Sequence, residues 1–174
     1  STTANGTYKM GDVVAITVTF NEAVTVTGIP QLTLETGSTD AVVNYSSGSG
    51  STTLTFNYTV ASGHISSDLD YVNTTALALN SGTIKDAEGN NATLTLASPG
   101  GSNSLGANKA LVVDGVAPSV SGVSISSASG VQNSLLNAED VVSVSATFSE
   151  NVTKTGSPQL VLNVGGTTRN ATDG

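Results

Sequence analysis

The chain has 174 residues, a formal net charge of −8, a pI near 4.2, no Cys, no Trp and one His. With so few cations it has no phosphate-binding surface for nucleic acid, and without thiols it has neither disulfides nor the usual zinc ligands. No apolar run is long enough to insert in a membrane, and an acidic surface poor in Lys suits a cation-rich exterior.

Short alternating apolar patterns follow one another along the chain, separated by turn sequences. The first predicted strand covers residues 14–20, where Val14, Ile16, Val18 and Phe20 share one face. The strongest alternation follows in 54–60, where Leu54, Phe56, Tyr58 and Val60 share one face. Further strands are predicted near 32–34, 71–79, 92–96 and 110–113, between turns at 46–51, 61–64, 86–91 and 98–104. This succession predicts an all-β fold, an Ig-like antiparallel β-sandwich.

The pattern restarts after residues 114–118, which we interpret as a linker because Asp-Gly is turn-prone and Pro118 restricts its neighbours. Strands are predicted in 119–126, 141–148 and 159–164. Seven residues recur 128 positions later: Asp12, Phe20, Glu22, Gly28, Pro30, Gln31 and Leu32 return as Asp140, Phe148, Glu150, Gly156, Pro158, Gln159 and Leu160.

This recurrence predicts tandem repeats. Residues 1–113 are expected to form one repeat lacking its first strand, 114–118 the linker, and 119–174 the opening part of a second repeat. Phe20 and Phe148 are expected to be equivalent core residues.

Several segments together resemble a known family. They are YKMGDVVAITVTFNEAVTVTG (8–28), SGSGSTTLTFNYTV (47–60), SSDLDY (66–71), GTIKDAEGNNATLTL (82–96) and VVDGVAPSV (112–120). The chain resembles the tandem Ig-like, cadherin-like repeats of giant bacterial adhesins and of repeat-rich cell-surface proteins linked to swimming motility. The resemblance implies a non-catalytic extracellular repeat at the bacterial cell surface, with neighbouring repeats as partners and often calcium at the junctions.

Acidic residues near the linker are candidates for that calcium. Alternate loops of an Ig-like sandwich cluster at opposite poles, and this topology directs Asp68, Asp70, Asp114 and Glu150 toward the junction. Carboxylates and carbonyls supply the oxygen ligands that Ca²⁺ requires. Asp-x-Asp and Asp-Gly are also common turn formers, which is the alternative interpretation.

A second, weaker calcium site is expected at the opposite pole from Glu22, Asp86 and Asn90, with Glu88 in the same loop. An Asx-turn is the alternative explanation of residues 86–91.

Catalysis is not expected. His64 is the only histidine and lies in a predicted exposed turn, so a nucleophilic triad has no second candidate base. The sequence therefore favours a structural spacer or stalk repeat. The alternatives are a subunit of a self-assembling extracellular filament or surface layer joined by strand exchange, and a carbohydrate-binding module.

Overall fold

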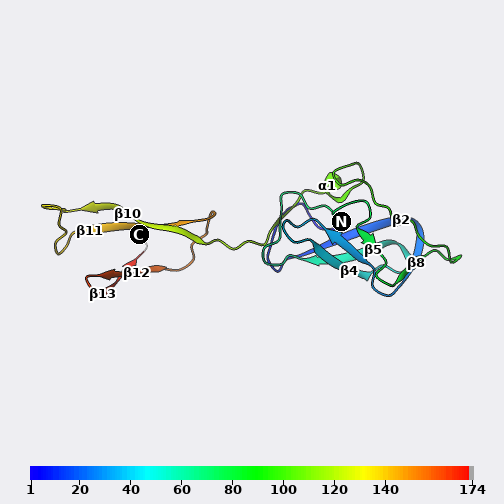
Figure 1. Ribbon diagram of the computed structural model, residues 1–174, viewed down its shortest axis with the longest axis horizontal. Helices are drawn as coiled ribbons and strands as arrows, with labels where there is room; N and C mark the ends of the chain where they lie inside the picture. Colours follow the sequence, from blue (N-terminus) through cyan, green and yellow to red (C-terminus); the bar gives the residue numbers. More distant parts are fainter. Residues whose placement is uncertain (173–174) are drawn as a thin grey trace. The chain divides into compact units, whose positions relative to one another are not determined.

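The computed structural model describes residues 1–172 and is all-β apart from one four-residue helix (Figure 1). The chain divides into two units, Ser1–Val116 and Ala117–Gly174, and residues 173 and 174 lie outside the described part. The division falls inside the expected linker 114–118.

The first unit contains β1 (Gly6–Lys9), β2 (Val13–Thr27), β3 (Gln31–Leu34), β4 (Ala41–Ser47), β5 (Ser51–Thr59), β6 (Ile65–Ser66), β7 (Leu77–Ala78), β8 (Thr83–Lys85), α1 (Leu105–Asn108) and β9 (Leu111–Asp114). The second contains β10 (Val120–Ser129), β11 (Val141–Phe148), β12 (Gln159–Val164) and β13 (Thr167–Thr172).

Two sheets make up the first unit. One has six strands in the order β7-β3-β4-β5-β2-β8, and the other has three in the order β1-β9-β6. All pairs are antiparallel except β1–β9, which is parallel and joins residues near the two ends of the unit. Both sheets contribute to one hydrophobic core, which includes Phe56 from β5 and Leu111 from β9.

The period-two pattern explains which side chains enter that core. Along β5, Leu54, Phe56 and Tyr58 are at most 2% exposed, while the intervening side chains are exposed or half-buried. Along β2, Val14 and Ile16 are equally buried, and Phe20 is half-buried against the same core. The predicted facing of these two strands is therefore confirmed.

Two predicted strands are wrong in extent. Of the 71–79 region only Leu77–Ala78 is a strand, and residues 92–96 form none. The side chains of Ala92, Leu94 and Leu96 still pack against the core as their alternation predicts. Strand assignment requires a continuous hydrogen-bonded ladder, however. The backbone bonds from Ala92 N–H to Ile84 in β8 and from Leu96 N–H to Thr74 are isolated, so this segment joins neither sheet of the first unit.

The second unit consists of two separate two-stranded sheets, β10–β11 and β12–β13. Every residue of β10 is exposed, including Val123 at 52% and Ile125 at 68%. Phe148 is 39% exposed, so the expectation of a core residue there is wrong. A two-stranded sheet has no second layer to bury its apolar face, which accounts for this exposure.

Local structure recurs between the units at the same offset as the sequence. In the β3–β4 pair, Leu32 lies opposite Val43, and in the β12–β13 pair their counterparts Leu160 and Ala171 lie opposite each other. The turn before β2 is closed by Lys9 N–H donating to Asp12, and the turn before β11 by Asn137 N–H donating to Asp140. Gly28 and Gly156 have φ of +70° and +72°.

Candidate metal centre

Three carboxylates meet where β2 bulges away from β5 and β8 ends. Glu22 lies in the irregular part of β2, where the pairing with β5 shifts register between Thr19 and Val24. Asp86 follows β8 directly, and Glu88 lies in the turn after it. One oxygen from each of the three carboxylates lies within 4.8 Å of the other two. The pairing of β2 with β8, with Thr25 opposite Lys85, brings these distant positions together.

Asp86 is the best fixed of the three. Its Oδ1 accepts the backbone N–H of Asn90 at 2.7 Å, and its Oδ2 accepts the side-chain amide of Asn90 at 2.7 Å. The hydrogen bond from the side-chain amide of Asn90 has the largest effect and lowers the pKa of the Asp86 carboxyl. Burial raises this pKa, and backbone hydrogen bonds from Asn90, Glu88 and Gly89 lower it further. The anionic form is thus favoured before any cation arrives.

The side-chain amide of Asn90 therefore donates to Asp86, and the loop has the hydrogen bonding of an Asx-turn. The two interpretations of residues 86–91 are compatible, because each carboxylate oxygen has a second lone pair for a cation. Glu22 and Glu88 are exposed and Asp86 is half-buried, so water can complete a coordination shell around the three carboxylates. The arrangement suits a hard, oxygen-binding cation.

Asp68 and Asp70, predicted as junction ligands, lie together beside α1. A Cβ on Gly106 would be 3.1 Å from Asp70 Oδ2 and 3.5 Å from Asp68 Oδ2. The Asp70 carboxylate accepts three backbone N–H groups, from Tyr71 at 2.9 Å, Gly100 at 3.0 Å and Leu105 at 3.2 Å. Asp70 thereby holds the 98–105 loop against the unit, a role that needs no metal.

Asp114, the third predicted junction ligand, lies at the other end of β9. Leu69 N–H donates to Leu111 at the start of this strand, whereas Asp114 lies opposite Ile65 at its end. The rise of a strand places these positions about 10 Å apart. Asp114 accepts the N–H of Val116, and Glu150 belongs to the second unit. The first unit thus brings together Asp68 and Asp70, but not Asp114.

His64 is not the exposed turn residue that the sequence suggested. It is half-buried, its ring stacks on Tyr58 with centroids 5.8 Å apart, and its Nδ1 lies 2.9 Å from the Tyr58 hydroxyl. Burial raises the pKa of Tyr58 to about 12. No sequence motif marks this pair, because the two residues are on opposite sides of the turn at residues 62 and 63.

Comparison of the chain with protein-family models, with curated proteins and with solved structures finds no match. Among the described residues, no helix has the length and apolar character needed to cross a membrane.

Proposed function

We propose that this chain is a non-catalytic spacer in a large extracellular protein of the bacterial cell surface, built from tandem Ig-like β-sandwich repeats. Its activity would be to hold a length and a stiffness between other parts of that protein. The observation that carries the proposal is the shared register of β3–β4 and β12–β13, in which each pair of partners recurs 128 residues later. Repetition of one unit along a chain is how extended proteins gain length.

Two further features support this function. The largest buried side chains of the first unit, including Phe56 and Tyr58, belong to its hydrophobic core. The net charge of −8 also suits a surface exposed to cations outside the cell.

Calcium is the second part of the proposal. We assign Glu22, Asp86 and Glu88 as a weak Ca²⁺ site, with an affinity of about 10⁻⁴ to 10⁻³ M as in other extracellular modules. The site fixes the β2 bulge to the turn after β8, so an ion there would stiffen one end of the first unit.

The surface location is tested by protease treatment of intact cells that produce the protein. Peptides of this chain should appear in the supernatant before any cytoplasmic marker does. Release only after lysis would contradict the proposed function.

Calcium binding is tested by thermal melts of the 174-residue chain in Ca²⁺ and in EDTA. A hundredfold excess of Ca²⁺ over Kd should add about 2.7 kcal/mol to the free energy of unfolding of the first unit. Glu22→Gln should remove most of this gain, whereas Asp40→Asn, an exposed carboxylate of the same unit outside the group, should retain it. Equal melting in EDTA and Ca²⁺ would show that the three carboxylates hold no Ca²⁺.

A further inference from the structure

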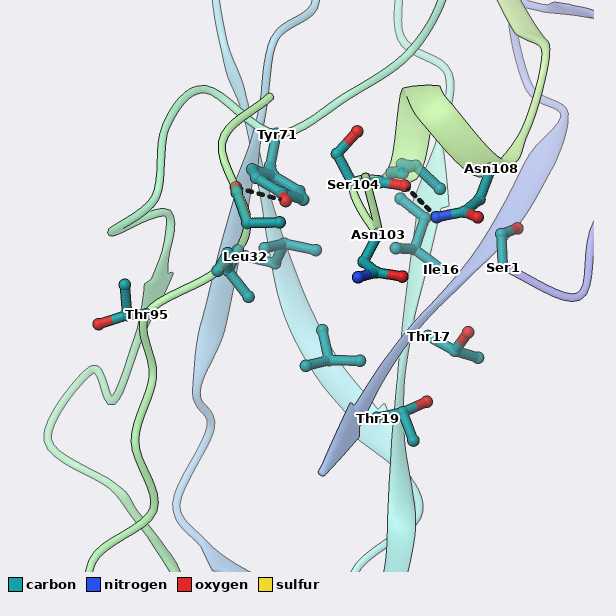
Figure 2. A pocket seen from close by; sticks show the side chains of 14 residues that line it. Ser1, Ile16, Thr17, Thr19, Leu32, Tyr71, Thr95, Asn103, Ser104 and Asn108 are labelled. Atoms are coloured by element: carbon teal, nitrogen blue, oxygen red, sulfur yellow. Dashed lines mark hydrogen bonds between the residues drawn. The ribbon is translucent and has the colours of Figure 1, made fainter. Parts of the chain in front are cut away.

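A groove of about 450 Å³ runs along one edge of β2 in the first unit. Its apolar lining comes from Ile16, Val18, Leu32, Tyr71, Leu96 and Leu105. Figure 2 shows Thr17 and Thr19 on one side of the groove and Leu32, Tyr71 and Thr95 on the other. The groove therefore separates β2 from the 92–97 segment, which the sequence predicted as a strand but which joins no sheet of the first unit.

The backbone of β2 presents hydrogen-bonding groups toward this groove, and those of Ala15 are taken by the side chains of the chain's own first residues. Ala15 directs its C=O and N–H away from β5, because they bond the side chains of Ser1 at 2.6 Å and Thr3 at 2.8 Å. Backbone groups alternate along a strand, so Thr17 and Thr19 point the same way as Ala15. Within residues 1–172 no strand pairs with β2 on this side before Thr25, where β8 begins to pair.

The second unit shows what pairs with the equivalent edge. β11 repeats β2, and β10 lies antiparallel to it with Ser124 opposite Ser145, the counterpart of Thr17. Ser149 N–H donates to Ser119 C=O at 2.8 Å, so the odd-numbered residues of β11 face β10. These are the counterparts of Ala15, Thr17 and Thr19. β10 thus occupies the edge that faces the groove in the first unit.

The side chains of β10 also suit the lining of the groove. Val123 and Ile125 lie opposite Ala146 and Val144, which are the counterparts of Val18 and Ile16. Cross-strand partners project from the same face of a sheet. In the same register on β2, both apolar side chains would therefore lie on the core face, in the groove, instead of 52% and 68% exposed.

We propose that the groove is a strand-acceptor site that takes the β10 segment of a second copy of this chain. The donor is available because β10 belongs to a two-stranded sheet and buries none of its ten residues, and such a hairpin is marginally stable in water. Moving to β2 gives it the backbone groups of Thr17 and Thr19, the counterparts of its partners Ser145 and Thr147 on β11, together with a buried apolar face.

This interface is heterologous, since the second unit of one copy donates to the first unit of the next. Repeated addition therefore produces an open filament unless the rotation between successive copies closes a ring. The inference rests on the repeat relation in the proposed function, and it is independent of calcium and of surface location.

A labelled synthetic peptide of residues 117–129 tests the acceptor site on the 174-residue chain. We expect saturable binding that weakens by about tenfold or more in Thr17→Pro, which removes a groove-facing N–H but leaves the bonds to β5 intact. Thr17→Val keeps that N–H and should bind as well as the unaltered chain. A peptide carrying Val123→Asp and Ile125→Asp should not bind, and this control needs no folded variant of the chain.

Absence of binding by the unaltered peptide would overturn the proposal, as would equal binding to folded Thr17→Pro or by the doubly substituted peptide. The source of the strand is tested by sedimentation. The chain alone should form assemblies that grow with concentration and dissolve in excess peptide. A monomer at every concentration, with the peptide still binding, would refute donation by a second copy and assign the groove to a segment of the same polypeptide.

Discussion

The contact between Tyr58 and His64 makes a quantitative prediction about the first unit. Tyr58 is 2% exposed and its hydroxyl lies 2.9 Å from His64 Nδ1. The Ala61 N–H also points at Nδ1, at 3.3 Å, which makes this nitrogen the acceptor and the tyrosine hydroxyl the donor. Removing the imidazole would delete this hydrogen bond and the stacked ring, and it would leave the hydroxyl without its partner.

The expected loss for His64→Ala is about 2 kcal/mol, from about 1 kcal/mol for the hydrogen bond and about 1 kcal/mol for the ring contact and the unpaired hydroxyl. Tyr58→Phe should cost about 1 kcal/mol. In the double variant the hydrogen bond is already absent, so the coupling energy should be about 1 kcal/mol.

Denaturant unfolding followed by circular dichroism measures all four forms of this cycle. A coupling energy indistinguishable from zero, or a His64→Ala variant as stable as the unaltered chain, would refute the reasoning and restore the view of His64 as a passive turn residue.

Other perturbations have equally definite outcomes. Asp70→Ala should lower the free energy of unfolding by about 2 to 3 kcal/mol, because three backbone N–H groups lose their acceptor. Amide hydrogen exchange at Leu105 should accelerate, and unchanged exchange would contradict the role of Asp70 in holding the loop. Phe20→Ala should destabilise the first unit by about 2 kcal/mol, because Phe20 packs against its core. Phe148→Ala should destabilise the second unit by under about 1 kcal/mol, because Phe148 is 39% exposed. Equal losses in denaturant unfolding would count against this assignment. The pKa of Tyr58 is raised to about 12 from its ordinary 10.0, so its contribution to stability should be complete below pH 10 and disappear as the pH rises toward 12. Tyr58→Phe should reduce the alkaline loss in melts across that range and leave the part due to Tyr71, whose pKa is also raised by burial; an unchanged loss would contradict this assignment.

The sequence predicted best what depends on local alternation. Val14, Ile16, Leu54 and Phe56 were correctly placed in the core because each strand carries its own period-two signal. Residues 92–96 carry the same signal but form no strand, because pairing depends on a neighbour that local sequence does not specify.

The candidate site shows the same limit. Glu22 and Asp86 could be grouped from the order of the strands, and the structure places their carboxylates together. Asp114 lies at the end of β9, whereas Leu69, next to Asp68, bonds the start of that strand. Composition and spacing do not encode this register, so the separation of the two carboxylates could not be predicted. The role of His64 was missed for a related reason, since its burial arises from the ring of Tyr58 on the other side of a turn.

The parallel pairing of β1 with β9 also constrains when the first unit can fold. Gly6 lies opposite Leu111, and Lys109 Nζ donates to the carbonyl of Thr3, 106 residues away in sequence. Closing so long a loop is entropically unfavourable and comes late, which slows folding. During synthesis, the three-stranded sheet cannot form until residue 114 has emerged, whereas the β10–β11 hairpin needs only contacts between neighbours in sequence. The six-stranded sheet needs no residue beyond Lys85, so the second layer of the core would be completed only after the first sheet, when almost the whole first unit had been made.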